Sequence, residues 1–260
     1  MNLTRNMLVA VVLAAGGVAG AQNILALVYS AGFTGDPSID NIRQSLVATG
    51  ASVTWKDGAL PGDLAGFLSS AAYDSVFIHD ITATDGLTDS GDASALNSWY
   101  NAGKSAVLDG RSYGSLFQPL GGGSDLFLQN VATFFGANGG GLYIGGDDHP
   151  TWTKNANALL NAAGFSSFSG HFVEYRTYAA ASPLYAGMAD PNNDPAWDYG
   201  PGDWTVSQSP VGPQVNGTTL EGIFFNGNDV PLISSYLVPA PGAVGLAVLA
   251  GLITSRRRRA

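Results

Sequence analysis

Short apolar runs alternate with amphipathic segments along the first two thirds of the chain. The runs have the length of strands and cover residues 24–29, 53–55, 75–78, 105–108 and 142–144. Between them, apolar residues recur at helical spacing, as at Ile39, Ile42 and Leu46, and glycines such as Gly50 end the segments. Strands without a polar face that alternate with helices are typical of a parallel sheet covered on both sides. We therefore expect a three-layer α/β fold with a mostly parallel sheet.

The pattern changes after Gly164. Runs at residues 172–178, 220–225 and 230–236 predict further strands, separated by loops rich in proline, glycine and aspartate. No linker-like tract divides these strands from the preceding segments. We expect them to extend the same sheet, within one domain over residues 22–237.

The first 21 residues have the layout of a secretory signal peptide. Arg5 precedes an apolar run over residues 7–21, which closes on the small-residue site Ala19-Gly20-Ala21. We expect signal peptidase to cleave before Gln22. The alternative is a buried first helix, but each glycine in the run weakens a helix interior by about 1 kcal/mol.

Residues 238–260 have a three-part layout. The sorting-motif residues Val238, Pro239 and Pro241 precede an apolar stretch over residues 243–254, and a basic run of Arg256, Arg257, Arg258 and Arg259 follows. Twelve helical residues span about 18 Å, and with its flanks the stretch approaches the bilayer core of about 30 Å. We expect a short transmembrane helix with its arginines on the cytoplasmic side, so that the main domain is exported across the inner membrane.

This tail resembles the PEP-CTERM sorting signal, which membrane enzymes called exosortases recognise. It retains the order and spacing of motif, helix and arginine run, with Ala240 where the family most often has glutamate. The resemblance implies an exosortase substrate that is processed near residues 238–241. It also implies a secreted protein of the cell envelope, delivered to the cell surface or extracellular matrix. The alternative is a plain C-terminal membrane anchor.

Four stretches of the middle domain resemble the class I glutamine amidotransferase-like branch of the flavodoxin-like folds. They cover residues 73–78, 140–146, 157–160 and 182–187. The resemblance implies a flavodoxin-like fold and supports no particular activity. The extra β strands in the C-terminal third are expected from the hydrophobic pattern after Gly164.

Charge is unevenly distributed along the chain. All 20 carboxylates lie between Asp36 and Asp229, whereas only six of the 11 basic residues do, which gives the middle a formal charge of −14. This charge repels nucleic acid and anionic lipid surfaces, so neither is expected as a partner. The absence of cysteine from the sequence excludes disulfides, thiolate metal sites and a cysteine nucleophile.

Polar residues follow the expected parallel strands at their carboxyl ends, where open α/β sheets bind ligands. The candidate ligand-binding residues are His79, Asp80, Asp109, Arg111, Asp147, Asp148 and His149. Parallel strands bring such residues to one edge. The architecture alone explains part of the pattern, because polar residues appear wherever strands leave a core.

Hydrolysis is the first of three kinds of chemistry that compete for this edge. Gly110-Arg111-Ser112-Tyr113-Gly114 fits the Gly-x-Ser-x-Gly pattern directly after a strand. The resemblance to amidotransferase-like enzymes places Ser112 at the nucleophile's turn, with His171 and Glu174, or His149 and a nearby aspartate, as base and orienting acid. Two residues separate His171 from Glu174, which departs from the family's His-x-Glu spacing. Composition alone predicts the serine pattern about 0.4 times in this chain.

The second chemistry is binding of Ca²⁺ or another divalent cation by Asp147, Asp148 and His149. The loop at residues 190–194 begins like an EF-hand but has proline at the required glycine and glutamate positions.

The third possibility is binding without catalysis, by a domain that binds a glycan, a partner protein or the extracellular matrix. Four loop aromatics could stack on sugars or else cap the core: Trp152, Trp197, Tyr199 and Trp204. We expect no organic cofactor and a non-catalytic binding domain, with a serine hydrolase or amidase that uses Ser112 as the alternative.

Overall fold

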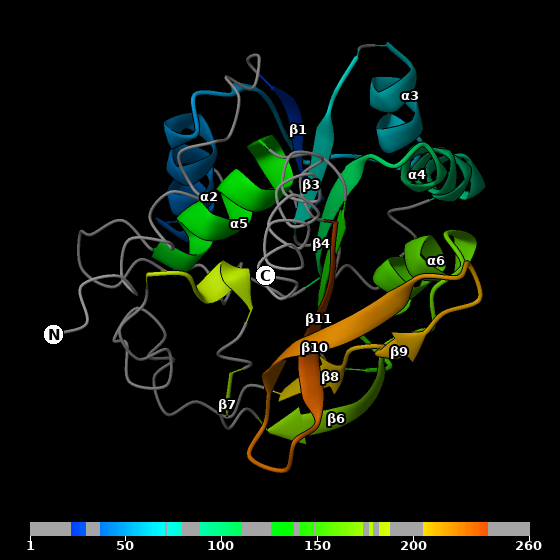
Figure 1. Ribbon diagram of the computed structural model, residues 1–260. Helices are drawn as coiled ribbons and strands as arrows, with labels where there is room; N and C mark the ends of the chain where they lie inside the picture. Colours follow the sequence, from blue (N-terminus) through cyan, green and yellow to red (C-terminus); the bar gives the residue numbers. More distant parts are fainter. Residues whose placement is uncertain are drawn as a thin grey trace, which may run out of the picture. The chain divides into compact units, whose positions relative to one another are not determined.

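Five parallel strands form the centre of the fold (Figure 1). The computed structural model describes residues 22–29, 37–70, 72–79, 89–110, 126–137, 141–147, 149–173, 177–178, 182–187 and 205–238. The five strands are β1 (Asn23–Val28), β2 (Ser52–Asp57), β3 (Ser75–His79), β4 (Ser105–Gly110) and β5 (Gly141–Gly146). Their order is β2-β1-β3-β4-β5, which is that of flavodoxin-like folds. The expected fold class is confirmed.

Helices cover both faces of the parallel strands (Figure 1). One face carries α2 (Pro37–Ala48) and α5 (Leu126–Ala137), and the other carries α3 (Asp63–Ser70), α4 (Ser90–Asn101) and α6 (Lys154–Ala162). On the first face, Phe77 of β3 shares a buried cluster with Phe135 of α5. On the second, Ile78 shares a cluster with Leu96 of α4 and Leu160 of α6. Neighbouring residues of β3 thus enter different cores, which explains why the strand has no polar face.

The C-terminal third extends the sheet with antiparallel strands. β11 (Pro231–Leu237) pairs with β5, β10 (Thr219–Phe225) pairs with β11, and both β7 (Thr177–Tyr178) and β9 (Gly212–Pro213) pair with β10. The described residues therefore form a nine-stranded sheet, and the expected extension is confirmed. The prediction of a single strand over residues 172–178 is wrong, because these residues contribute to two strands, β6 (Ser169–Val173) and β7. β6 pairs with β8 (Thr205–Gln208) in a separate two-stranded sheet.

The two described ends of the domain lie at one edge of the parallel strands, and the ends of β3 and β4 lie at the other. Asn23 opens β1, and Leu237 of the antiparallel β11 lies opposite Gly141, the first residue of β5. Asn23 and Leu237 therefore both lie at the amino edge. His79 and Gly110 end β3 and β4 at the opposite, carboxyl edge.

A buried carboxylate joins α3 to α4. Asp92, in the first turn of α4, is 0% exposed, and its two carboxylate oxygens accept the backbone N–H groups of Gly62 and Ala65, each at 2.9 Å. The Asp92 backbone N–H in turn donates to the side chain of Asp89, the N-cap of α4, at 2.8 Å. Asp92 thus satisfies N–H groups at the start of a helix that lies 27 to 30 residues earlier in the chain.

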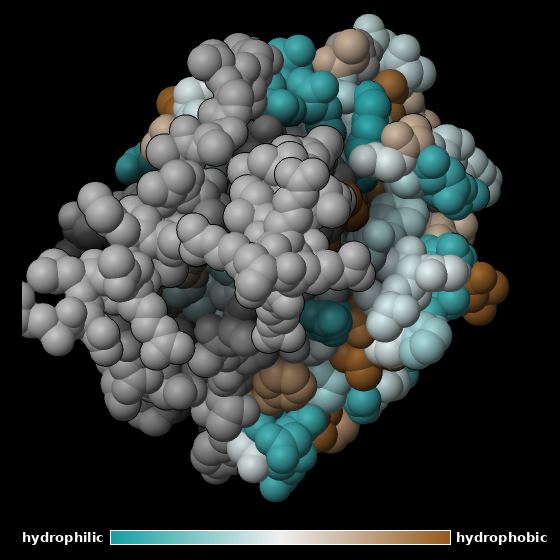
Figure 2. Space-filling view, in the orientation of Figure 1, coloured by the Kyte–Doolittle hydropathy of each residue, from teal (hydrophilic) through white to brown (hydrophobic). Residues whose placement is uncertain are grey.

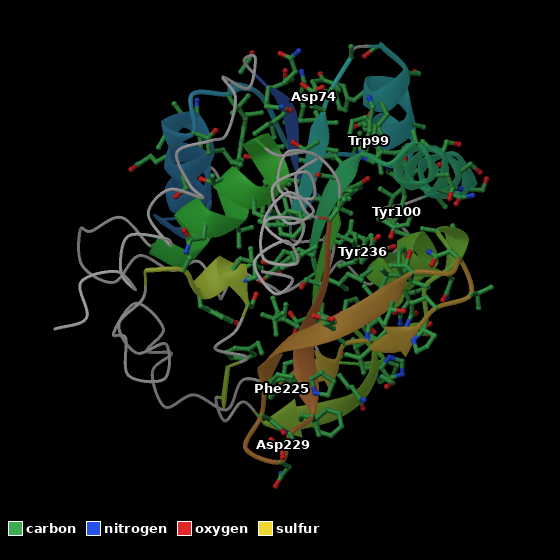
Figure 3. All side chains as sticks on the ribbon, viewed as in Figure 1. Asp74, Trp99, Tyr100, Phe225, Asp229 and Tyr236 are labelled. Atoms are coloured by element: carbon green, nitrogen blue, oxygen red, sulfur yellow. The ribbon has the colours of Figure 1, made fainter. Side chains whose placement is uncertain are left out.

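Two further local contacts fix the ends of elements. Trp99 of α4 donates its indole N–H to the carbonyl of Ser105 at the start of β4, at 2.9 Å (Figure 3). In the turn between β10 and β11, Asn226 accepts the N–H of Val230 through its side chain at 3.0 Å. Asp229 in the same turn has a φ of 59°, in the left-handed region (Figure 3).

Residues Ala21–Leu237 form one compact unit. The predicted signal peptide, and the predicted tail apart from Val238, lie outside the described residues. Within the part of the chain that is described, no helix is both long enough and apolar enough to span a bilayer.

Candidate functional site

The carboxyl edge of the parallel strands contains a reversal of strand order. β1 lies between β2 and β3, so the chain moves to one side of β1 for β2 and to the other side for β3, β4 and β5. Open α/β sheets bind ligands outside the carboxyl ends of the strands at such a switch point. Tyr29 directly follows β1 and His79 ends β3, and the Tyr29 N–H donates to the His79 carbonyl at 3.2 Å.

His79 and Asp109 are neighbours at this edge. They occupy opposed positions of the adjacent parallel strands β3 and β4, so their side chains leave the same face of the sheet. Each is only 1% exposed, and the His79 ring lies 6.2 Å, centroid to centroid, from that of Phe77. A buried imidazole beside a buried carboxylate is costly to desolvate, and polar groups of this kind require polar partners.

Asp147 and His149 follow β5 at the same edge. Both side chains are partly buried. The Nδ1 atom of His149 lies 3.0 Å from the hydroxyl of Thr153, which is fully buried before α6. The hydroxyl of Ser207 in β8 donates to the carbonyl of Asp147. These bonds tie Asp147 to β8 and His149 to the residue before α6.

Tyr29 is a candidate site residue that the sequence analysis did not select. Its side chain is 2% exposed, and its hydroxyl has no hydrogen-bond partner among the described residues. Burial, together with the negative charges of Asp92, Asp63 and Asp89, raises the pKa of the Tyr29 hydroxyl. The phenol therefore keeps its proton. The only sequence signal was a tyrosine at the end of an apolar strand, and a core tyrosine gives the same signal.

Some sequence-predicted residues are not brought to this edge or lie outside the described residues. His171 is an exposed residue of β6, which belongs to the separate two-stranded sheet. Other predicted residues lie outside the described part, namely Asp80, Arg111, Ser112, Asp148, Glu174, Trp197, Tyr199, Trp204 and the loop at residues 190–194. Among the described residues, no three histidine, aspartate or glutamate side chains are grouped closely enough to hold a metal ion. Trp152, between β5 and α6, is 42% exposed.

The glycine that ends β5, Gly146, has a packing role. A Cβ atom on Gly146 would lie 2.6 Å from the ring of Phe168, which is 1% exposed. Asn157 of α6 holds the Phe168 segment there, because its side-chain oxygen accepts the Phe168 N–H at 2.7 Å. The close approach of Phe168 therefore accounts for glycine at this position.

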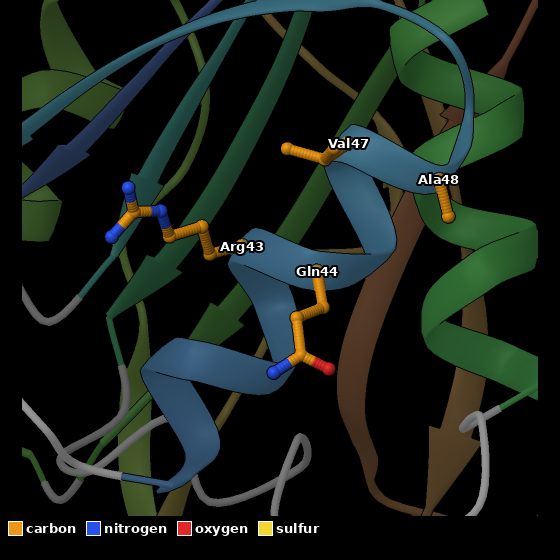
Figure 4. Close-up of a pocket in the computed structure, with 4 residues that line it drawn as sticks. All are labelled: Arg43, Gln44, Val47 and Ala48. Atoms are coloured by element: carbon orange, nitrogen blue, oxygen red, sulfur yellow. The ribbon is translucent and has the colours of Figure 1, made fainter.

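A surface hollow of about 480 Å³ lies beside α2 (Figure 4). The described residues that line it are Arg43, Gln44, Val47 and Ala48. They all come from the C-terminal half of one helix, and none comes from a strand end. In the view of Figure 2, the hydrophobic residues among those that are coloured appear as separate spots between hydrophilic ones. The carboxyl edge is therefore the stronger candidate for a site.

The described fold is a flavodoxin-like α/β domain with polar residues gathered at its carboxyl edge. No protein-family model, curated protein or solved structure matches the chain.

Proposed function

We propose that this protein is an exported protein of the cell envelope whose domain binds a small polar ligand at its carboxyl edge without catalysing a reaction. The observation that carries the site is the opposed pair His79 and Asp109, both 1% exposed beside the switch point. Apolar residues at these two positions would extend the existing core at lower desolvation cost. Residues that cost stability in this way are expected where binding requires them.

Binding is tested through the histidine side chains, of which the chain has only three. Imidazole NMR signals are recorded with CaCl₂, MgCl₂, inorganic phosphate, glucose, glucosamine and glucuronate in turn. We expect at least one compound to shift the His79 signals and raise the melting temperature, and Asp109→Asn to remove both effects. The proposal fails if no compound shifts the His79 signals, or if Asp109→Asn leaves the response unchanged.

Export is supported by the sequence of the two ends. The basic and apolar segments before Gln22, and the motif, apolar stretch and arginine run after Leu237, are the features expected of a secreted and exosortase-sorted chain. Cells that express the protein are fractionated, and the termini of the recovered chain are identified by mass spectrometry. We expect an envelope or extracellular product that begins at Gln22. Recovery of the untrimmed chain from the cytosol contradicts export.

Hydrolysis is the second candidate, and one observation favours it. The buried strand β4 ends at Gly110, which is the first residue of the Gly-x-Ser-x-Gly pattern, and such a pattern is expected directly after a strand. A fluorophosphonate probe decides between the two functions. Binding alone predicts equal labelling of the protein and of Ser112→Ala. Labelling that is lost in Ser112→Ala, and reduced in His79→Gln, would establish a hydrolase instead.

A further inference from the structure

Trp152 exposes a large part of its ring to solvent in the segment between β5 and α6. The side chain is 42% exposed, and β5 ends at the carboxyl edge of the sheet, six residues earlier in the chain. Tryptophan side chains are highly buried on average. The other exposed large hydrophobic side chains among the described residues are Val47, Leu60, Val211, Val215 and Tyr236. Packing within the domain therefore accounts for only part of the Trp152 ring.

A contact between His149 and Thr153 closes the short segment that carries Trp152. Nδ1 of His149 lies 3.0 Å from the hydroxyl oxygen of Thr153. Thr153 itself is 0% exposed, and its carbonyl accepts the N–H of Asn157 in α6 at 2.8 Å. Trp152 is thus bonded directly to a residue that the core and α6 hold in place. A ring held in this way loses little conformational freedom when a ligand covers it.

The chain neighbours of Trp152 do not continue its apolar surface. Pro150, Thr151 and Lys154 are all exposed, and two of them are polar. In the view of Figure 2, the coloured hydrophobic residues are separated by hydrophilic ones. Protein–protein interfaces instead bury a continuous apolar core within about 800 Å² per partner. A single aromatic ring among polar residues therefore fits a small ligand better than a protein partner.

The indole ring and the charge of the domain together restrict the ligand. An indole face is flat and apolar, and it matches the C–H face of a sugar ring, whose hydroxyl groups then bond to water or to polar side chains. A nucleotide also has a flat ring, but the formal charge of −14 on the middle of the chain repels its phosphates. The same charge disfavours sugars that carry carboxylates.

We propose that Trp152 is the stacking surface of a binding site for a neutral oligosaccharide. The inference goes beyond the proposed function, because it assigns a ligand to an exposed ring and does not involve the buried pair His79 and Asp109. The ring covers one sugar unit of the chain. Because Thr153 already holds the segment, binding requires no rearrangement of the core.

NMR signals of the indole N–H groups test the proposal on the full chain. The sequence has five tryptophans, and the signal of Trp152 is the one that disappears in Trp152→Phe. Cellotetraose, xylotetraose, maltotetraose and tetra-N-acetylchitotetraose are added in turn. We expect at least one of them to shift the Trp152 signal. Its affinity should be the same with and without about 0.5 M NaCl, since a neutral ligand is not screened by salt.

Two substitutions of Trp152 separate stacking from ordinary apolar contact. Leucine and phenylalanine both replace the part of the ring that packs on the domain, but only phenylalanine keeps an aromatic face. By calorimetry, we expect Trp152→Leu to weaken binding of the sugar about five- to tenfold and Trp152→Phe to weaken it about twofold. Val215→Ala changes another apolar side chain, which is 94% exposed, and should leave the affinity unchanged.

Three results overturn the proposal. The first is that none of the four oligosaccharides shifts the Trp152 signal, and tetramethylammonium in the same series then shows whether the ring binds cations instead. The second is equal affinity of Trp152→Leu and Trp152→Phe for the sugar. The third is a shift of the Trp152 signal when the protein alone is concentrated, which would mean that the ring contacts a second copy of the chain.

The signals of Trp152 and His79 distinguish this inference from the proposed function. If an oligosaccharide shifts Trp152 while no compound shifts His79, the inference stands and the proposed site fails. If a compound of the first panel shifts His79 while no oligosaccharide shifts Trp152, the inference alone fails.

Discussion

The buried carboxylate of Asp92 provides a direct test of how α3 and α4 are held together. Replacement by asparagine keeps the shape of the side chain but turns one of its two accepting oxygens into an NH₂ group. That group then faces a backbone N–H of Gly62 or Ala65, 2.9 Å away in the native protein. One N–H is left unpaired in a buried position, and the remaining bond loses its charge.

The magnitude follows from the bonds that are lost. A hydrogen bond to a charged group is worth about 1.5–3 kcal/mol. Asp92→Asn should therefore lower the free energy of unfolding by about 2 kcal/mol, and Asp92→Ala, which removes both bonds, by about 4 kcal/mol. For a domain of this size, 1 kcal/mol corresponds to about 3 °C in melting temperature. We expect losses of about 6 °C and about 12 °C.

Asp89→Asn is the matched control, because it removes the same charge from the same cluster while asparagine caps helices as well as aspartate does. Thermal unfolding of the three variants gives the global effect. Hydrogen exchange of the Gly62 and Ala65 amides gives the local one, and both should lose protection in Asp92→Ala. If Asp92→Asn and Asp89→Asn lower the melting temperature equally, the account of Asp92 as the bond between the two helices is refuted.

Three further predictions follow from local geometry and ionisation. Gly146→Ala should lower the free energy of unfolding by about 1–3 kcal/mol because of its contact with Phe168, and urea titration should show partial recovery when Phe168→Leu is added. Asp229→Gly should keep or slightly raise the melting temperature, whereas Asp229→Val should lower it, since a branched residue resists a positive φ. Burial raises the pKa of Tyr29 and of Tyr100, so the folded state retains protons that the unfolded state releases near pH 10. Stability should therefore be independent of these groups below about pH 10 and fall as the pH rises further, and melting curves across this range should fall less steeply for Tyr29→Phe.

The parallel strands could be predicted from the sequence because both of their faces are buried. Ile78 and Phe77 enter opposite cores, and a continuous apolar run is the direct result. β8 could not be predicted in the same way, since Ser207 is buried through its bond to the Asp147 carbonyl, and buried serines of this kind look like loop residues in a sequence. That β6 and β7 belong to different sheets could not be predicted either. Their separation depends on pairing with β8 and with β10, which lie far along the chain.

The candidate site shows the same limit. His79 and Asp109 were predictable because polar residues that end apolar strands stand out, and parallel order then brings them together. Tyr29 was not predictable, because only the folded packing shows that its hydroxyl has no partner among the described residues. The role of Asp92 in α3 depends on a contact 27 residues away.

The antiparallel course of β11 decides which edge of the sheet the end of the domain occupies. Because Leu237 lies opposite the first residue of β5, the last strand closes at the same edge at which Asn23 opens the first. His79 and Asp109 lie at the opposite edge, so the first and last described strands begin and end away from the candidate site.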